Sequence, residues 1–279
     1  MQKQKSKKKM HQNPHKSSHK PVLLAETLKY LNPKKGEAYL DVTAGYGGHA
    51  RAVLECTSNF KDTVLVDRDK LAISELKSEF NSTGVTLTNR DYLSASQELL
   101  NSGRQFDLIL ADLGVSSPHL NEVNRGFSFG IEGPLDMRMD QEQEKTAWDI
   151  VNKSSEEEIA EILWRYGEEP RSRQIARRII LNRPVNTTAE LAKIAKEAWP
   201  GRSKVHPATR TFQAIRIAVN DELGQLNQAL PIWLKLLKLK GRLAIISFHS
   251  LEDRLVKQFL ASQAGNRYVF PLFLPSPTF

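Results

Sequence analysis

Cysteine is almost absent from this chain, because Cys56 is the one cysteine among 279 residues. A single thiol excludes a disulfide within the chain and any zinc site built on cysteine ligands. His11, His15 and His19 recur every four residues, but they lie in a polar, proline-containing segment, so we expect no metal site. A reducing compartment is the simplest setting for such a chain, and we expect a cytoplasmic protein.

Long apolar runs are also missing, and none approaches the ~18 residues of a membrane helix. Residues 1–20 contain seven lysines, no acidic residue and no arginine. A secretory signal requires an apolar segment after its basic start, and none follows here. A transit peptide would be amphipathic and rich in arginine, which this segment is not. We therefore expect no membrane association, and a disordered basic tail over residues 1–20.

Charge is unevenly distributed along the chain, whose net charge is +8. Residues 132–161 hold ten acidic and three basic residues, whereas residues 165–216 hold twelve basic and four acidic ones. An arginine-rich segment of this kind favours a polyanionic partner such as nucleic acid. The alternative is a set of solvated helix faces without a partner.

A glycine-rich turn stands in residues 39–50, between a short apolar run and a helical pattern. Gly45, Gly47 and Gly48 allow the backbone to approach a ligand closely, and the first turn of the following helix offers free N–H groups. Asp67 closes the next apolar run, about 20 residues on, where a carboxylate can reach ribose hydroxyls. The pattern predicts a site for a nucleoside-bearing cofactor.

Strand and helix patterns alternate through the first half of the chain, which favours a parallel, doubly wound sheet. An amphipathic helix is expected first, over residues 21–31. The expected strands are 38–43, 63–67, 85–88 and 106–111, and the helices between them are 48–57, 69–80 and 94–101.

The pattern changes after Asp112. Residues 113–145 are irregular, and four helical patterns follow before a buried strand at 242–248, the last two covering 209–219 and 221–238. Two of the helix starts have the spacing of a capping box, at Ser154 with Glu157 and at Thr187 with Glu190. We predict an α/β domain made of residues 21–135 and 215–279, interrupted by a helical domain over residues 136–214.

The glycine turn alone does not identify the cofactor, because it satisfies G-x-G-x-x-A and fits a dinucleotide fold as well as a methyltransferase. Two features favour methylation. A polar loop, 112–118, leaves the carboxyl end of a central strand, and the basic insertion suits an anionic macromolecule. The structural alternatives are a cap role for Asp112 and a surface position for His49.

Nine segments between residues 19 and 260 resemble, in the same order, the motifs of one family. They are His19–Leu24, Gly47–His49, Val66–Asp69, Asp112–Pro118, Arg125–Phe129, Gly133–Asp140, Tyr166–Glu168, His206–Gln213 and Ser247–Arg254. The chain is similar to the RsmH (formerly MraW) family, which methylates the N4 of a cytidine in 16S rRNA, near the decoding centre, with S-adenosyl-L-methionine. The resemblance implies a Rossmann-like class I methyltransferase fold with an inserted all-α substrate-recognition domain, and the 30S subunit as partner.

The resemblance also implies the residues that bind the cofactor. Gly47, Gly48 and His49 would contact its methionine end, Asp67 its ribose, and Tyr92 its adenine, where the family usually has phenylalanine. The complete implied set is Gly45, Gly47, Gly48, His49, Asp67, Tyr92, Asp112 and His119.

Cytosine N4 is a poor nucleophile, because its lone pair is delocalised into the ring. Its methylation needs acceptors that hold the amine hydrogens, and amino methyltransferases place such groups after the fourth strand. The catalytic candidates are Asp112, Ser116 and His249. Asp112 could instead bind only the cofactor, and His249 could instead have a structural role. Methylation at C5 would need a cysteine nucleophile, and Cys56 lies late in a helix, far from the strand ends.

Arginines and phenylalanines in the motifs are the candidates for binding RNA. Each arginine can bind a phosphate or pair internally with Asp136, Asp140 or Glu252, and each phenylalanine can stack on a flipped base or pack in the core. The substrate-binding candidates are Arg125, Phe127, Phe129, Arg138 and Arg210.

Two other functions and two other properties stay open at this point. The function alternatives are an NAD(P)-dependent oxidoreductase and a ribosome assembly factor that binds without catalysis. Homodimerisation is possible. The family pattern is expected to end after Phe259, which leaves the completeness of the sheet in question.

Overall fold

The sheet of this computed structural model, which describes residues 21–115, 122–199 and 205–264, has the order β3-β2-β1-β4-β5 with every neighbouring pair parallel. From β1, the chain moves to one side for β2 and β3 and to the other for β4 and β5. A ligand site is expected where the order reverses, at the carboxyl ends of β1 and β4. The strands are β1 (Tyr39–Asp41), β2 (Thr63–Asp67), β3 (Thr86–Asn89), β4 (Phe106–Asp112) and β5 (Leu237–Ile246).

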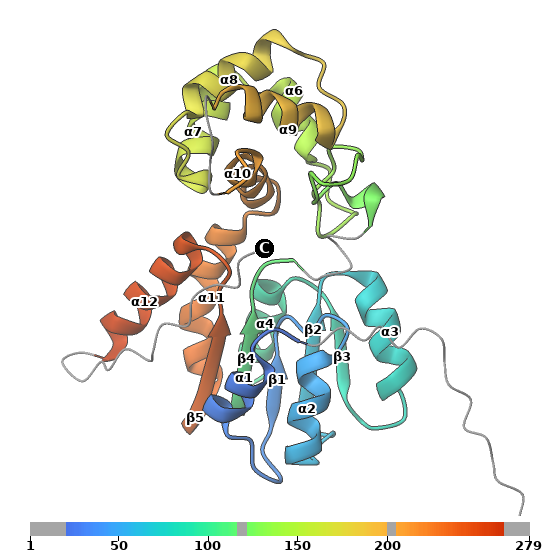
Figure 1. Ribbon diagram of the computed structural model, residues 1–279. Helices are drawn as coiled ribbons and strands as arrows, with labels where there is room; N and C mark the ends of the chain where they lie inside the picture. The colour runs from blue at the N-terminus through green and yellow to red at the C-terminus, as the bar shows by residue number, and fades with distance from the viewer. Residues whose placement is uncertain (1–20, 116–121, 200–204, 265–279) are drawn as a thin grey trace, which may run out of the picture.

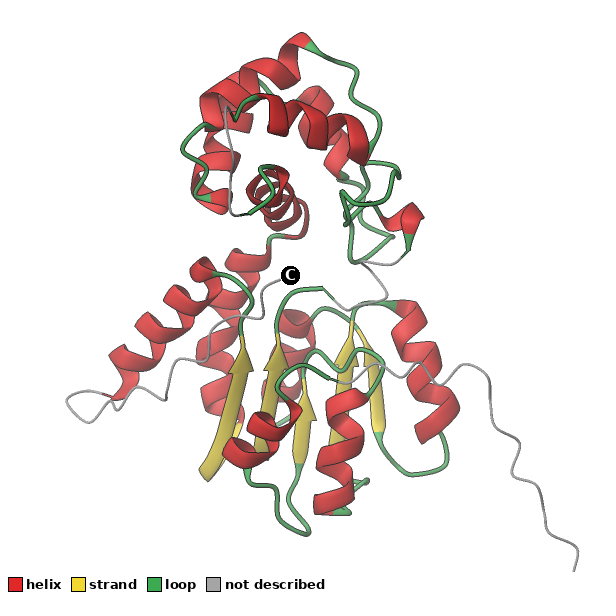
Figure 2. Ribbon diagram, viewed as in Figure 1, coloured by secondary structure: helices red, strands yellow, loops and turns green. Residues whose placement is uncertain are grey.

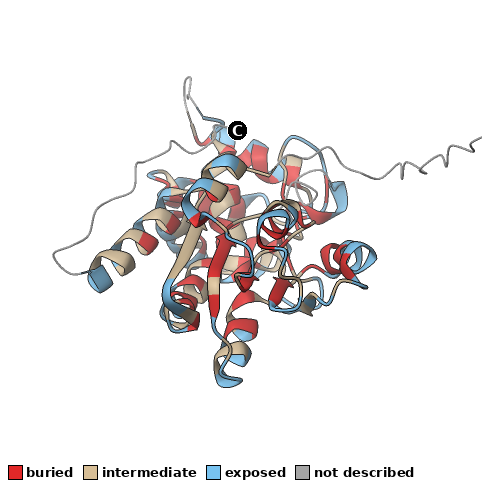
Figure 3. Ribbon diagram, turned by 90° about the horizontal axis from the view of Figure 1, so that it is seen from below, coloured by how far each residue is buried: buried red, intermediate tan, exposed pale blue. Residues whose placement is uncertain are grey.

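Helices cover both faces of the sheet, because side chains along each strand alternate between the faces. Tyr39, Leu65 and Leu108 face one helical layer, and their neighbours Leu40 and Val64 face the other. The three central strands of the sheet, β1, β2 and β4, are accordingly mostly buried, as Figure 3 shows. The first layer holds α1 (Leu24–Leu31), α2 (Gly48–Thr57) and α3 (Lys70–Phe80), and the second holds α4 (Tyr92–Asn101), α11 (Glu222–Leu236) and α12 (Ser250–Ala264) (Figure 1).

A group of helices between β4 and β5 has an apolar core of its own, whose buried members all lie between Phe127 and Val219. Figures 1 and 2 show these helices beyond the carboxyl ends of the strands. The group ends at Asp221, whose φ of 49° joins α10 directly to α11. Its elements are η1 (Val123–Arg125), α6 (Ala147–Lys153), α7 (Glu156–Gly167), α8 (Ser172–Leu181), α9 (Thr188–Glu197) and α10 (Ala208–Asn220).

The expected helices and strands are largely confirmed, and α2 and β2 have the predicted bounds. One predicted capping box is wrong by a residue: Ser155 and Glu158 form it, whereas Ser154 ends α6 in extended conformation. The box at Thr187 and Glu190 is confirmed. Helices α6 and α8 were not predicted.

The last strand begins earlier than predicted. We expected a helix as far as residue 238, but β5 starts at Leu237, opposite Phe106. Lys238 donates to Asp107 at 2.8 Å, which holds this early part of β5 beside β4. Leucine and lysine alternate from Leu237 to Lys240, which is typical of a strand and is consistent with this early start of β5.

Some expectations concern segments that the structure does not describe, namely the basic tail of residues 1–20 and residues 265–279. Within the described ranges, no helix combines the length and the apolar character that crossing a membrane requires. The predicted domain boundary between residues 214 and 215 falls inside the continuous helix α10, and the domain bounds stay a prediction.

Candidate functional site

The loops that follow β1 and β4 meet at the carboxyl edge of the sheet. The backbone N–H of Asp112 donates to Thr43 Oγ1 at 2.6 Å, and the N–H of Val42 donates to the carbonyl of Leu110 at 3.0 Å. These bonds fix the last residue of β4 against the start of the glycine turn. The two segments predicted to carry the chemistry therefore lie side by side.

The glycine turn is shaped by close packing. Gly47 has a φ of 80°, and a Cβ there would lie 2.8 Å from Cδ2 of Leu76 in α3. A Cβ on Gly48 would lie 2.5 Å from Cγ of Pro21, so the amino-terminal segment covers this point. Both positions therefore require glycine for the chain's own packing, and the first N–H groups of α2 stay available to a ligand.

Asp67 connects the turns after β1 and β2. One carboxylate oxygen accepts from the N–H of Gly45 at 2.7 Å, and the other accepts from the N–H of Asp69 at 2.8 Å. Both donors are backbone N–H groups, so the carboxylate of Asp67 holds the two turns in fixed positions. Asp69 in turn caps α3 by accepting from the N–H of Leu71.

His49 faces Asp112 across the edge. The Nδ1 of His49 lies 3.7 Å from Asp112 Oδ2, and its Nε2 lies 3.0 Å from the carbonyl of Val22. A carbonyl can only accept, so Nε2 carries the proton of the neutral ring and Nδ1 presents a lone pair to Asp112. Burial lowers the pKa of His49, which keeps the ring neutral.

One carboxylate oxygen of Asp112 accepts no hydrogen bond from the described residues. This atom, Oδ1, is buried. Burial, followed by the charges of Asp41 and Glu252, raises the pKa of Asp112 to about 7. A carboxyl group with such a pKa exchanges protons near neutrality, as an acid–base group does.

Asp41 is a second buried carboxyl group, and sequence reasoning missed it. It accepts from the hydroxyl of Tyr39 at 2.8 Å and from the N–H of Thr43 at 3.2 Å. Burial raises the pKa of Asp41 to about 7. An acidic residue inside an otherwise apolar strand was the signal that could have identified it.

Tyr92 stands at the first position of α4, after the carboxyl end of β3, and is 8% exposed. Its hydroxyl donates to the carbonyl of Glu222 at 3.2 Å, and its ring contacts Trp233 edge to face, with centroids 5.6 Å apart. Burial raises the pKa of Tyr92 well above its usual value, so the phenol stays protonated. These contacts fix the ring that is expected beside adenine.

His249 lies at the start of α12, in a network of buried charges. Its Nε2 is 3.3 Å from Glu252 Oε1, and its Nδ1 accepts from the N–H of Glu252 at 3.3 Å. Burial alone would raise the pKa of Glu252, but His249, Arg216 and the N–H of Phe248 outweigh it, so that pKa is lowered. In this arrangement His249 is engaged with α12, and its substrate role stays a prediction.

Glu222, His249 and Glu252 place their possible ligand atoms within 4.8 Å of one another, as a metal site would. Arg216, however, donates to both carboxylate oxygens of Glu222, each at 2.9 Å. The guanidinium already supplies a positive charge next to these carboxylates. We therefore interpret the group as a charge network that joins α10, α11 and α12.

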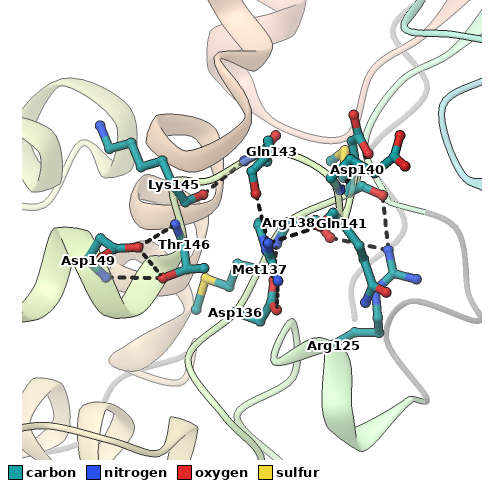
Figure 4. Close-up of polar contacts among 12 residues, drawn as sticks. Arg125, Asp136, Met137, Arg138, Asp140, Gln141, Gln143, Lys145, Thr146 and Asp149 are labelled. Atoms are coloured by element: carbon teal, nitrogen blue, oxygen red, sulfur yellow. Dashed lines mark hydrogen bonds and ion pairs between the residues drawn. The ribbon is translucent and has the colours of Figure 1, made fainter.

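The arginines of the motifs mostly have internal partners (Figure 4). Arg138 forms a two-pronged contact with Asp136, at 2.9 and 2.8 Å, which was one of the expected alternatives. Arg125 is 3% exposed, donates to the carbonyls of Arg138 and Met139, and lies 3.5 Å from Asp69. Arg210 is exposed and donates to the carbonyl of Glu168. Of these three arginines, Arg210 is the one whose side chain is exposed enough to contact an RNA.

The remaining candidates divide between core and surface. Phe127 is buried in the helical core. Phe129 is partly exposed, and its ring stacks on His206 with centroids 4.7 Å apart. Ser116 and His119 lie outside the described residues.

A known family matches nearly the whole chain that carries this geometry. The model of the family, described as "MraW methylase family", matches residues 16–277. The match extends past Phe259, so the expectation that the family pattern ends there is wrong. That expectation depends on short motifs, the last of which ends at Arg254. The segment beyond it contains no such motif, so motif comparison alone does not detect the similarity there.

Several curated proteins named "Ribosomal RNA small subunit methyltransferase H" are similar to the chain over most of their length. The one from Cyanothece sp. is 49% identical over 246 residues, 87% of this chain and 82% of that protein. The one from Acidobacterium capsulatum is 41% identical over 269 residues, 93% and 90% respectively. The one from Heliobacterium mobile is 46% identical over 256 residues, 88% and 82%.

Proposed function

The chain belongs to the MraW methylase family, and from this premise we propose that it transfers a methyl group from S-adenosyl-L-methionine to N4 of a cytidine in 16S rRNA. One observation carries the proposal: Asp112 ends β4 beside the glycine turn and presents a buried oxygen without a partner among the described residues. An acceptor in this place suits the N–H group of an exocyclic amine.

The residues at the edge fit the proposed cofactor, which supplies the methyl group as an electrophile on its sulfonium. Gly45 and Gly47 have left-handed backbone and carry no side chains, so neither residue blocks the approach of a ligand to the start of α2. Asp67 ends β2 beside the glycine turn, where a carboxylate can reach ribose hydroxyls, and Tyr92 offers an aromatic ring whose hydroxyl is already satisfied. Gly48 and His49 complete the proposed binding set, with His119 carried over from the resemblance alone.

Asp112 has two tasks in this proposal. Its carboxylate accepts a hydrogen bond from the amine, which draws the nitrogen lone pair out of the cytosine ring. It then takes the proton that the amine loses on methylation, because its pKa of about 7 makes it a competent base near neutrality. His49 lies beside this carboxylate, with Nδ1 3.7 Å from Asp112 Oδ2, and its lowered pKa keeps the ring neutral, so the proton stays on Asp112.

The helices between β4 and β5 stand over this edge, and we assign them, with bounds of 136–214, to recognition of the rRNA. A cytidine inside folded RNA must leave its stack to reach Asp112, which costs a few kcal/mol. The partly exposed Phe129 and the exposed Arg210 support such a role. The same proposal includes a cytoplasmic location, the 30S subunit as substrate and a homodimer.

The test is methylation of small-subunit RNA by the purified protein. The protein is incubated with 30S subunits or 16S rRNA that lack the modification and with isotopically labelled S-adenosylmethionine, and digested nucleosides are identified by mass spectrometry. We expect label in N4-methylcytidine. Label in 5-methylcytidine, or in no nucleoside, contradicts the proposal.

Two comparisons separate the rival functions. Calorimetric titration with S-adenosylmethionine and with NAD distinguishes a methyltransferase from an oxidoreductase. The Asp112→Asn variant should keep its affinity for S-adenosylmethionine and lose roughly 100-fold or more in turnover, since a positioned base contributes about that much. A binding-only assembly factor would bind 30S subunits equally well in both forms and methylate in neither.

A further inference from the structure

The basic segment of residues 165–216 contains cations of two kinds. Most of its arginines have partners within the protein: Arg178 pairs with Glu197, Arg216 with Glu222, and Arg183 donates to the carbonyls of Val151 and Ser154. Arg171 likewise donates to the carbonyl of Ala198 and lies over the ring of Trp199. These arginines hold the helical group together.

Four cations of the same segment are exposed and have neither an ion pair nor a side-chain hydrogen bond among the described residues. They are Arg173 and Arg177 in α8 and Lys193 and Lys196 in α9. Each pair is three or four residues apart, so each lies on one face of its helix. The opposite faces of α8 and α9 are buried in the helical core.

The two exposed faces are neighbours. The ion pair between Arg178 and Glu197, with a nitrogen–oxygen distance of 3.3 Å, joins the last turn of α8 to the last residue of α9. Arg177 precedes Arg178, and Lys193 lies one turn before Glu197. We call the four unpaired cations Arg173, Arg177, Lys193 and Lys196 the α8–α9 basic face.

No acidic side chain of the segment is free to neutralise this face. Glu168 accepts from Ser250 and Arg254, Glu169 is fully buried, and Glu197 pairs with Arg178. Glu190 is occupied by its capping box at the start of α9. Within the described part of residues 165–216, the face therefore presents positive charge that no acidic side chain of the segment compensates.

The α8–α9 basic face is also remote from the carboxyl edge of the sheet, where Asp112 lies. In Figure 1, α8 and α9 lie at the end of the molecule away from the sheet, with α10 between them and the strands. A single cytidine bound near Asp112 would not reach them. A partner that touches both places has to be large and carry regularly spaced negative charge.

On the basis of the proposed function, we propose that the α8–α9 basic face binds phosphates of the small-subunit rRNA at a distance from the methylated nucleotide. Guanidinium and ammonium groups on one helical face suit contacts to a sugar–phosphate backbone, which give affinity without reading sequence. The α8–α9 basic face holds the rRNA by its phosphates while one cytidine is methylated at the carboxyl edge of the sheet.

The test compares two variants of equal net charge. One replaces the face by glutamine: Arg173→Gln, Arg177→Gln, Lys193→Gln and Lys196→Gln. Glutamine has nearly the helix propensity of lysine and arginine, so the helices are kept. The control replaces four exposed lysines outside the helical group: Lys34→Gln, Lys35→Gln, Lys61→Gln and Lys77→Gln. Thermal unfolding and binding of S-adenosylmethionine confirm that both variants are folded.

Binding to deproteinised 16S rRNA and to 30S subunits is then measured as a function of salt. For each phosphate that the face variant no longer binds, we expect affinity to fall about fivefold at 0.15 M salt and the slope of log K against log salt to decrease by ~0.7–0.9. KM for 30S subunits should rise while kcat and methylation of a short oligonucleotide stay unchanged. The control variant should bind as the wild type does.

Three results overturn the inference. An unchanged salt slope in the face variant shows that these cations contact no phosphates. An equal loss of affinity in the control shows only unspecific charge attraction. A loss with 30S subunits but none with deproteinised rRNA identifies an acidic ribosomal protein as the partner. Binding is read without methyl transfer, so failure of the proposed chemistry leaves this test valid.

Discussion

Asp67 accepts a 2.7 Å hydrogen bond from the backbone N–H of Gly45, so the end of β2 fixes the turn that follows β1. The same carboxylate also holds the N–H of Asp69. A residue expected to bind ribose is thus also part of the scaffold, and its replacement will affect both stability and cofactor affinity. The two effects can be separated by comparison with a residue that has only the structural task.

Replacement of Asp67 by alanine should lower the free energy of unfolding by ~1–3 kcal/mol, because two N–H groups lose their acceptor. It should also weaken binding of S-adenosylmethionine, measured by calorimetry below the unfolding temperature. The control is Ser155→Ala, which removes the cap of α7 at a similar cost of ~1 kcal/mol. If Asp67→Ala loses stability but keeps its cofactor affinity, Asp67 has no part in ribose binding.

The methyl-transfer rate should depend on pH through Asp112. The pKa of Asp112 is about 7 and only the carboxylate accepts a proton, so the single-turnover rate should fall about tenfold per pH unit below that value. His49 does not add a second limb near neutrality, because its pKa is lowered. Binding of S-adenosylmethionine, measured at the same pH values, is the control. A flat profile between about pH 6 and 8 would show that the Asp112 carboxylate is not the base.

Replacement of Asp41 by asparagine should stabilise the protein increasingly as pH rises. In the wild type the folded pKa of about 7 lies above the usual 3.8, so the folded state holds more protons than the unfolded state between these values. Stability therefore falls as pH rises through this window, and asparagine removes that loss. The difference in unfolding free energy should grow in the variant's favour from about pH 4 to 7 and level off above it. Denaturant unfolding at several pH values measures it, and a constant difference is the contrary result.

Two glycines with left-handed backbone form a matched pair for mutation. A Cβ on Gly47, whose φ is 80°, would lie 2.8 Å from Leu76, whereas a Cβ on Gly103, whose φ is 73°, would meet no atom within 4 Å. Alanine at Gly103 should cost ~1–2 kcal/mol, from the backbone alone. Alanine at Gly47 should cost ~1–3 kcal/mol more, because it overpacks the contact with α3, and should abolish cofactor binding. Equal losses in chemical denaturation would mean that the side chain of Leu76 yields freely.

The position of the candidate site was predictable from sequence because parallel strands end at the same side of a sheet. Asp67 and Asp112 each close an apolar run, so strand prediction alone was enough to bring them to this edge. The early start of β5 was not predictable in this way, since the leucines before Gly241 also continue the apolar spacing of the preceding helix. The pairing of Leu237 with Phe106, far away in sequence, places this segment in the sheet, and Lys238 adds a contact to Asp107.

The partners of the arginines were not predictable from sequence either. Arg125 donates to two backbone carbonyls, and Arg183 does the same, but carbonyls leave no mark in a sequence. In α8, Ile175, Ala176 and Ile179 have helical spacing, but three arginines interrupt this short apolar pattern. The distinction between structural and free cations therefore depends on the three-dimensional arrangement.

The contact between His49 and the carbonyl of Val22 makes the amino-terminal segment a working part of the catalytic edge. Cleavage of the chain just after Val22 would release that carbonyl and uncover Gly48, where Pro21 now rests. The imidazole would then be free to hold its hydrogen on either nitrogen. A trimmed protein of this kind would keep the strands of its sheet and lose the contact that fixes the His49 tautomer, so intact mass should be verified before any loss of activity is ascribed to a mutation.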